Sequence, residues 1–142
     1  MTHYGINSSK ISVVHNGIDV IDYPQRHNMP LILKRLKKEG HQIILFVGRL
    51  TLQKGPDYFI TTAKRVLELR PKTLFVVAGS GDMQNQIIRE AAGLGIADKI
   101  FFVGFLRGEE LNQIYRAADL YVLPSVSEPF GITPLEALVN GA

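Results

Sequence analysis

From residue 41 to residue 123, short and wholly apolar runs alternate with amphipathic stretches of helical spacing. The apolar runs predict β-strands at 43–47, 74–78, 100–103 and 120–123. The amphipathic stretches predict helices at 57–71, 82–95 and 108–119. Gly48, Gly79 and Gly104 directly follow the first three runs, and Pro71 stops the first helix.

Strands that are apolar throughout, rather than alternating, are buried on both faces of a sheet. Helices between such strands imply a parallel sheet, and right-handed crossovers place the helices on both of its faces. We therefore expect an α/β fold, a Rossmann-like parallel sheet with helices on both faces. The 142 residues, of which 46% are hydrophobic, fit one domain spanning residues 1–142 with a full core.

The first forty residues carry weaker patterns. Residues 11–14 predict a short strand, followed by a turn at Asn16 and Gly17. Residues 30–40 predict a helix with Pro30 in its first turn and Gly40 just past its end. The basic residues of this helix are interpreted as a solvated face near its C-terminus, because no aromatic residues interleave them as nucleic-acid stacking would require.

Composition excludes several classes of site. The chain has no cysteine, so a disulfide framework, a thiolate zinc site and a cysteine nucleophile are excluded. Its four histidines lie far apart and show no metal-ligand spacing, and its net charge of +3 is too small to indicate nucleic-acid binding. No apolar run approaches the ~20 residues of a membrane span, and no signal peptide is recognisable. We expect a soluble, cytoplasmic protein without a bound metal, with at most peripheral membrane contact.

In an open parallel sheet, ligands bind beyond the carboxyl ends of the strands. The candidate loops are therefore GRLTLQKG (48–55), GSGD (79–82), GFLRG (104–108) and PSVSEPFGITP (124–134). Known phosphate motifs do not fit them. Gln84 stands where the third glycine of the dinucleotide fingerprint would be, and the first loop lacks the spacing of a Walker loop.

The loop 48–55 carries two cations, Arg49 and Lys54, and leads through Gly55 and Pro56 into a helix. A helix start attracts anions, and arginine offers a fork of donors to phosphate oxygens. The loop is thus able to neutralise a diphosphate without metal. Two exposed surface charges explain the same residues equally well.

The segment SEPFGITPLEA holds two glutamates, Glu128 and Glu136. The prolines and the glycine between them forbid one continuous helix. Thr133 is predicted to cap a helix whose first residue is Pro134, with Glu136 completing a capping box. Glu128 is then a loop residue. A pair of carboxylates acting together, as in a glycosidase, is neither established nor excluded by this spacing.

The segment EPFGITPLEA closely resembles the Glu–seven residues–Glu signature of group 1 retaining glycosyltransferases. These enzymes have the GT-B fold and include glycogen and sucrose synthases. VVHNGID, GRLTLQKG, VVAGSGD, FVGFL and AADLYVLPS also appear in the family's order and at its approximate spacing, over nearly the whole chain. The resemblance implies a truncated C-terminal half of a GT-B enzyme, the nucleotide-sugar-binding domain, with the N-terminal acceptor domain missing.

The resemblance also implies roles for individual residues. Arg49 and Lys54 would bind the donor diphosphate and stabilise charge on the leaving group. Glu128 would contact the transferred sugar, and Glu136 would accept hydrogen bonds from the ribose. Backbone contacts are implied for Gly48 at the phosphates, for Gly104, Phe105 and Leu106 at the base, and for Phe130, Gly131, Ile132 and Thr133 at the sugar and diphosphate.

The implied reaction is transfer of a hexose from a UDP-, ADP- or GDP-sugar with retention of configuration, without metal or other cofactor. Glu128 would then position the sugar rather than attack it. A non-catalytic nucleotide-binding or interaction module remains an alternative. A sugar-nucleotide epimerase is a third, which the glutamate pair and GRLTLQKG disfavour. The sequence does not indicate the nucleobase, the sugar or the acceptor.

Overall fold

The structure, a computed structural model, describes residues 5–20 and 30–142. Within them, four parallel strands form a sheet in the order β3-β2-β1-β4. The strands are β1 (Gln42–Val47), β2 (Thr73–Ala78), β3 (Ile100–Gly104) and β4 (Leu120–Tyr121). The helices are α1 (Leu31–Lys38), α2 (Pro56–Leu69), α3 (Gln84–Gly93), α4 (Gly108–Ala117) and α5 (Ile132–Asn140). None of these helices is long and apolar enough to cross a membrane.

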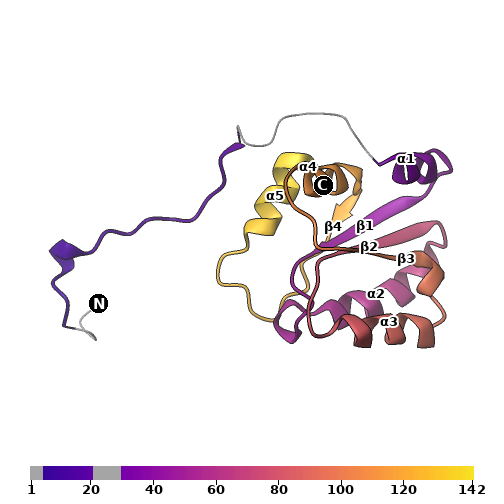
Figure 1. Ribbon diagram of the computed structural model, residues 1–142, viewed down its shortest axis with the longest axis horizontal. Coiled ribbons are helices and arrows are strands. Elements are labelled where there is room, and N and C mark those ends of the chain that lie inside the picture. The colour runs from indigo at the N-terminus through magenta and orange to yellow at the C-terminus, as the bar shows by residue number, and fades with distance from the viewer. Residues whose placement is uncertain (1–4, 21–29) are drawn as a thin grey trace.

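Helices cover both faces of the sheet (Figure 1). On one face, Ile43 and Leu45 of β1 pack with buried residues of α1, α4 and α5. On the other face, Phe46 packs with buried residues of α2 and α3, among them Phe59 and Ile87. Each fully buried side chain of this size contributes roughly 1.5–3 kcal/mol. The predicted α/β sheet with two covered faces is confirmed.

The order of the strands determines where a ligand can bind. The chain runs outward from β1 to β2 and β3, and then returns to place β4 on the other side of β1. The helices that follow β1 and β4, α2 and α5, therefore lie on opposite faces of the sheet, and the carboxyl ends of these two strands form its topological switch point. The loops 48–55 and 124–131 lie at this switch point.

The predicted strand at 11–14 is wrong. Among residues 5–20 the structure has a short 3₁₀ turn at Ser8–Lys10 and no strand. Val13 and Val14 are 66% and 87% exposed, so no neighbouring element covers them. A β-branched run favours extended backbone, but a strand also needs a partner for its backbone hydrogen bonds.

β4 ends at Tyr121, two residues earlier than predicted. Its paired residues are Leu120 and Tyr121, and the backbone N–H of Val122 adds one further hydrogen bond to the carbonyl of Leu45, at 2.9 Å. Pro124, which has no N–H to donate, follows soon after.

The predicted capping box at the start of α5 is also wrong. The helix begins at Ile132, its N-cap is Gly131 with φ 76°, and no side chain caps it. Thr133 lies inside the first turn, where its hydroxyl accepts a hydrogen bond from the Tyr121 hydroxyl at 2.7 Å. A left-handed glycine turns the chain into the helix here, in place of a threonine cap.

Candidate functional site

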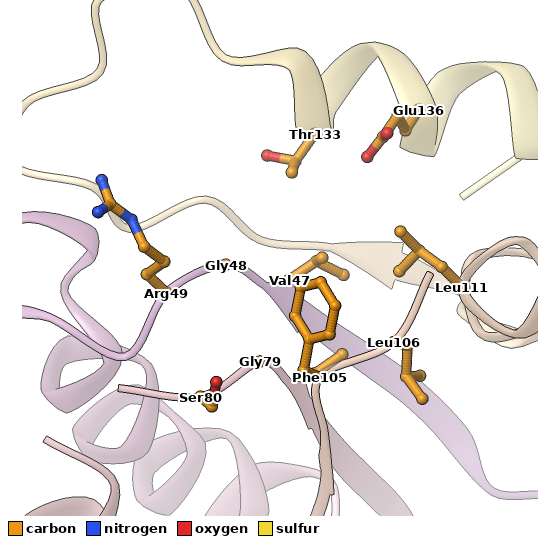
Figure 2. Close-up of a pocket in the computed structure, with 11 residues that line it drawn as sticks. Val47, Gly48, Arg49, Gly79, Ser80, Phe105, Leu106, Leu111, Thr133 and Glu136 are labelled. Atoms are coloured by element: carbon orange, nitrogen blue, oxygen red, sulfur yellow. The ribbon is translucent and has the colours of Figure 1, made fainter. Parts of the chain in front are cut away.

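A pocket of about 470 Å³ opens at the carboxyl ends of the strands. The ends of β1 and β2 form its base, the segment after β3 and the first turns of α4 form one wall, and the start of α5 lies opposite (Figure 2). Its lining residues are Val47, Gly48, Arg49, Ala78, Gly79, Ser80, Phe105, Leu106, Leu111, Thr133 and Glu136. This volume lies in the range of small-molecule sites.

The base of the pocket is backbone packed directly on backbone. Gly79 has φ 145°, and a Cβ placed on it would lie 1.9 Å from the carbonyl oxygen of Gly48. The N–H of Leu50 donates to the carbonyl of Ser80 at 3.0 Å, and the N–H of Gly79 donates to the carbonyl of Gly104 at 2.7 Å. The ends of three strands thus meet without side chains between them, which leaves the space above them open.

The lining combines apolar surface with a few polar groups. The larger apolar side chains are Val47, Phe105, Leu106 and Leu111, and the polar groups come from Arg49, Ser80, Thr133 and Glu136. Figure 2 shows Thr133 and Glu136 one turn apart on α5, above the strand ends. Such a pocket can hold a planar apolar group while bonding hydroxyl and anionic groups attached to it.

Arg49 is the exposed cation of the pocket. It makes no ion pair or side-chain hydrogen bond with any residue of 5–20 or 30–142. Its guanidinium rises from the end of β1 on the side where Thr133 lies (Figure 2). The start of α5 has unsatisfied backbone N–H groups and the positive end of the helix dipole. Together they favour an anion at this end of the pocket.

Lys54 and Glu128 form an ion pair beside the pocket. The Lys54 Nζ donates to the Glu128 Oε2 at 2.5 Å, and the two side chains are 19% and 20% exposed. The Ser125 hydroxyl also donates to this oxygen, at 3.2 Å. The hydrogen bond from Lys54 is the largest cause that holds the pKa of Glu128 below its usual value. Glu128 is therefore an ionised and partnered carboxylate, not a solvated loop residue.

Backbone contacts join the loops that carry this pair. The N–H of Val126 donates to the carbonyl of Gln53 at 3.0 Å, and the Gln53 amide donates to the carbonyl of Ser127 at 3.1 Å. Gly55 has φ 62°, and a Cβ there would lie 2.5 Å from the carbonyl oxygen of Pro124. Close packing of the two loops brings Lys54 and Glu128 together.

Two tyrosines hold the pocket side chains of α5. The Tyr115 hydroxyl donates to the Glu136 Oε2 at 3.1 Å, and the Tyr121 hydroxyl donates to the Thr133 Oγ1 at 2.7 Å. Burial is the largest cause that raises the pKa of Tyr121 to about 12, so this hydroxyl keeps its proton at neutral pH.

The structure brings many of the predicted site residues to the pocket. Its lining includes Gly48, Arg49, Phe105, Leu106, Thr133 and Glu136. Lys54 and Glu128 lie outside the lining and bond each other. Gly104 ends β3, and Gly131 precedes α5. The side chains of Phe130 and Ile132 are 45% and 47% exposed. Among the described residues, no three His, Asp or Glu side chains are grouped as metal ligands.

Sequence reasoning missed three residues around the site. Leu111, Tyr115 and Tyr121 give no functional signal, because apolar and aromatic residues in a helix or strand indicate core packing. Ser80 lies in one of the four candidate loops, and the position of that loop after β2 was the signal for it.

Residues 30–142 match the family of group 1 glycosyl transferases. An uncharacterised glycosyltransferase of Methanocaldococcus jannaschii is 40% identical over 136 residues, which cover 93% of this chain and 35% of that protein. The chain therefore spans about a third of the length of this relative.

Solved structures of GT-B glycosyltransferases share the fold. The C-terminal domain of a group 1 glycosyl transferase family protein from Francisella tularensis aligns with a TM-score of 0.69 and 26% identity, over 87% of this chain and 66% of that one. The pneumococcal O-GlcNAc transferase GtfA, in complex with UDP and GlcNAc, aligns with a TM-score of 0.66 and 26% identity, over 72% of this chain and 20% of that one.

Proposed function

The chain belongs to the group 1 glycosyltransferase family, and we propose that its pocket binds the nucleoside-diphosphate sugar donor of a retaining glycosyltransferase. One observation carries the proposal. A single pocket of about 470 Å³ combines apolar walls, the start of a helix, the carboxylate of Glu136 and the guanidinium of Arg49, which pairs with no residue of 5–20 or 30–142. A nucleoside diphosphate presents the matching groups, namely a base, ribose hydroxyls and an anionic tail.

The proposed placement follows the polarity of the lining. The diphosphate lies between Arg49 and the first turn of α5, where the backbone N–H groups of Ile132 and Thr133 face it. The ribose hydroxyls donate to Glu136. The base lies against the backbone from Gly104 to Leu106, and the absence of a side chain at Gly48 leaves room for the phosphates.

The contact between Lys54 and Glu128 supports a placement for the reacting bond. Lys54 is proposed to bind the phosphate next to the sugar, and Glu128 is proposed to bind the sugar hydroxyls. These targets are neighbours in the donor, on either side of the bond that breaks. A cation and a carboxylate 2.5 Å apart suit such a junction.

The proposed reaction breaks the bond between the anomeric carbon and the phosphate oxygen while the acceptor hydroxyl oxygen bonds to the same face of the sugar and gives its proton to the departing diphosphate. Arg49 and Lys54 stabilise the negative charge that develops on the departing diphosphate. No metal and no other cofactor takes part in this proposal, and Glu128 orients the sugar without attacking it. The acceptor binds to a second domain, since a relative such as that of Methanocaldococcus jannaschii is about three times as long as this chain.

Isothermal titration calorimetry with UDP-, ADP- and GDP-hexoses in the presence of EDTA tests the proposal. UDP-hexoses come first, because GtfA was solved with UDP. We expect at least one donor to bind, with an affinity that added Mg²⁺ does not change. Failure of every donor to bind would contradict the proposal, and binding that depends on Mg²⁺ would contradict its metal independence. Donor binding without transfer by the whole protein would favour a non-catalytic nucleotide-binding module.

A further inference from the structure

Each of the two side chains that α5 contributes to the pocket accepts a hydrogen bond from a tyrosine hydroxyl. Tyr115 of α4 is 0% exposed, and its hydroxyl donates to Glu136. Tyr121 of β4 is partly buried, and its hydroxyl donates to Thr133. A buried tyrosine hydroxyl needs a partner, and here both partners line the same pocket.

The two tyrosines also contact each other. Their ring centroids lie 5.9 Å apart with an interplanar angle of 62°, an edge-to-face arrangement. Tyr115 belongs to the core cluster that includes Leu45 of β1 and Ala137 of α5, and Tyr121 packs against that cluster. The hydroxyls are thus fixed by rings anchored in the core, so their positions vary little.

The start of α5 needs such support. Its N-cap, Gly131, has no side chain to hold the first turn. Farther along the helix, the Asn140 amide bonds Asn112 of α4 at 3.3 Å and anchors that end. The tyrosine hydroxyls provide side-chain anchors at the turn that faces the pocket.

We propose that Tyr115 and Tyr121 are positioning residues for the donor, Tyr115 aiming the Glu136 carboxylate at the ribose hydroxyls and Tyr121 aiming Thr133 at the diphosphate. The inference rests on the proposed function, because it takes Glu136 as the ribose ligand. A carboxylate has two oxygens and several lone pairs, so the bond from Tyr115 leaves acceptor capacity for a ribose. Holding that carboxylate in one orientation lowers the entropy lost when the nucleotide binds.

A comparison of two nucleotides isolates the contribution of the ribose hydroxyls to the binding affinity. Calorimetry would use the tightest binder among UDP, ADP and GDP, together with its 2′,3′-dideoxy counterpart, which lacks both ribose hydroxyls. We expect wild type to bind the ribonucleotide at least about tenfold more tightly, since each hydrogen bond to a charged group is worth that much. Tyr115→Phe should lower the affinity for the ribonucleotide about fivefold and change the affinity for the dideoxy nucleotide by less than about twofold.

The second tyrosine should behave differently. Tyr121→Phe acts through Thr133 at the diphosphate, so it should lower the affinity for both nucleotides by a similar factor, about threefold. Tyr58 of α2 offers the matched control, because it is 54% exposed and its hydroxyl bonds no residue of the described chain. Tyr58→Phe should bind both nucleotides as wild type does.

A background without Glu136 separates positioning from a general structural effect. If Tyr115 acts through this carboxylate, Tyr115→Phe should change nucleotide affinity by less than about twofold in a Glu136→Ala protein. Equal weakening of both nucleotides by Tyr115→Phe, or an undiminished effect in the Glu136→Ala background, would overturn the inference while leaving donor binding intact. Failure of wild type to bind any of the three nucleotides would overturn the proposed function, and this inference with it.

Discussion

The ion pair between Lys54 and Glu128 joins two residues that lie 74 positions apart in the sequence. It shows that the cation nearest the proposed reacting bond is already balanced by a carboxylate. Arg49, in contrast, has no such partner among the described residues. The two cations of loop 48–55, which sequence reasoning treated alike, are therefore different groups, and Arg49 offers the free charge to an incoming anion.

The Lys54–Glu128 pair predicts how the stability of the folded protein depends on pH. The pKa of Glu128 is lowered in the folded protein from 4.5, so the folded state keeps this carboxylate ionised where the unfolded chain protonates it. The stabilisation is therefore complete above pH 4.5 and is lost as the pH falls through the lowered pKa.

Urea unfolding of wild type, Glu128→Gln, Lys54→Met and the double variant, repeated at several pH values, measures the coupling between the two residues. We expect a favourable coupling at neutral pH that shrinks as the pH falls below 4.5. A coupling of unchanged size down to about pH 3 would contradict this account.

At the residue scale, the place of Arg49 at the pocket could be predicted from its loop, and that of Glu136 from the resemblance of its segment to the family motif. Tyr115 could not, since its contact with Glu136 joins α4 to α5 and depends on how these helices pack. Aromatic residues on a helix face ordinarily indicate core, and Tyr115 is also a core residue. Its proposed positioning role is indicated only by the hydrogen bond from its hydroxyl to Glu136.

The loops after β1 and β2 form the base of the pocket as one backbone layer. Their contact depends on Gly79, where a Cβ would lie 1.9 Å from the carbonyl oxygen of Gly48. That oxygen belongs to the backbone, so it cannot move aside without shifting the end of β1. The contact between the two loops therefore depends on Gly79, and also on Gly81, where a Cβ would lie 2.4 Å from the carbonyl oxygen of Leu50.

Gly79→Ala should destabilise the protein by about 2 kcal/mol or more, because both the left-handed φ and the close contact oppose a side chain. Gly93 is the matched control. It lies at the end of α3, and a Cβ there would meet nothing within 4 Å. Gly93→Ala should be neutral or stabilising by up to about 1 kcal/mol. Equilibrium urea unfolding measures both, and equal stabilities for the two variants would contradict the argument.

At the element scale, β1, β2 and β3 could be predicted, because each is a short and continuous apolar run. The strand at 11–14 failed because β-propensity does not supply a pairing partner. The start of α5 lies two residues earlier than predicted, because Gly131, with φ 76°, turns the chain into the helix. Local patterns thus located most elements, while strand pairing and the conformation of a single glycine decided the rest.

The chain as a whole matches only part of its relatives in length, and its fold is that of a glycosyltransferase domain. It spans 35% of its relative from Methanocaldococcus jannaschii, and it aligns with a separately solved C-terminal domain from Francisella tularensis.

We predict that the 142-residue chain alone binds the donor but transfers no sugar, because the proposed acceptor side of the cleft lies in a second domain. A radiolabelled-donor assay with simple sugar acceptors checks this, with the whole protein as the positive control. Turnover by the chain alone, at a rate comparable to the whole protein, would contradict the prediction.

The central claim is that the pocket at the carboxyl ends of the strands binds the donor through Arg49. Calorimetric titration of the tightest-binding nucleotide sugar into wild type, Arg49→Ala and Arg65→Ala tests it most directly. Arg65 is an exposed arginine on α2, away from the pocket lining, and provides the matched control. We predict that Arg49→Ala lowers the affinity at least about tenfold, roughly 1.5–3 kcal/mol, and that Arg65→Ala leaves it unchanged. Wild-type affinity in Arg49→Ala would contradict the claim.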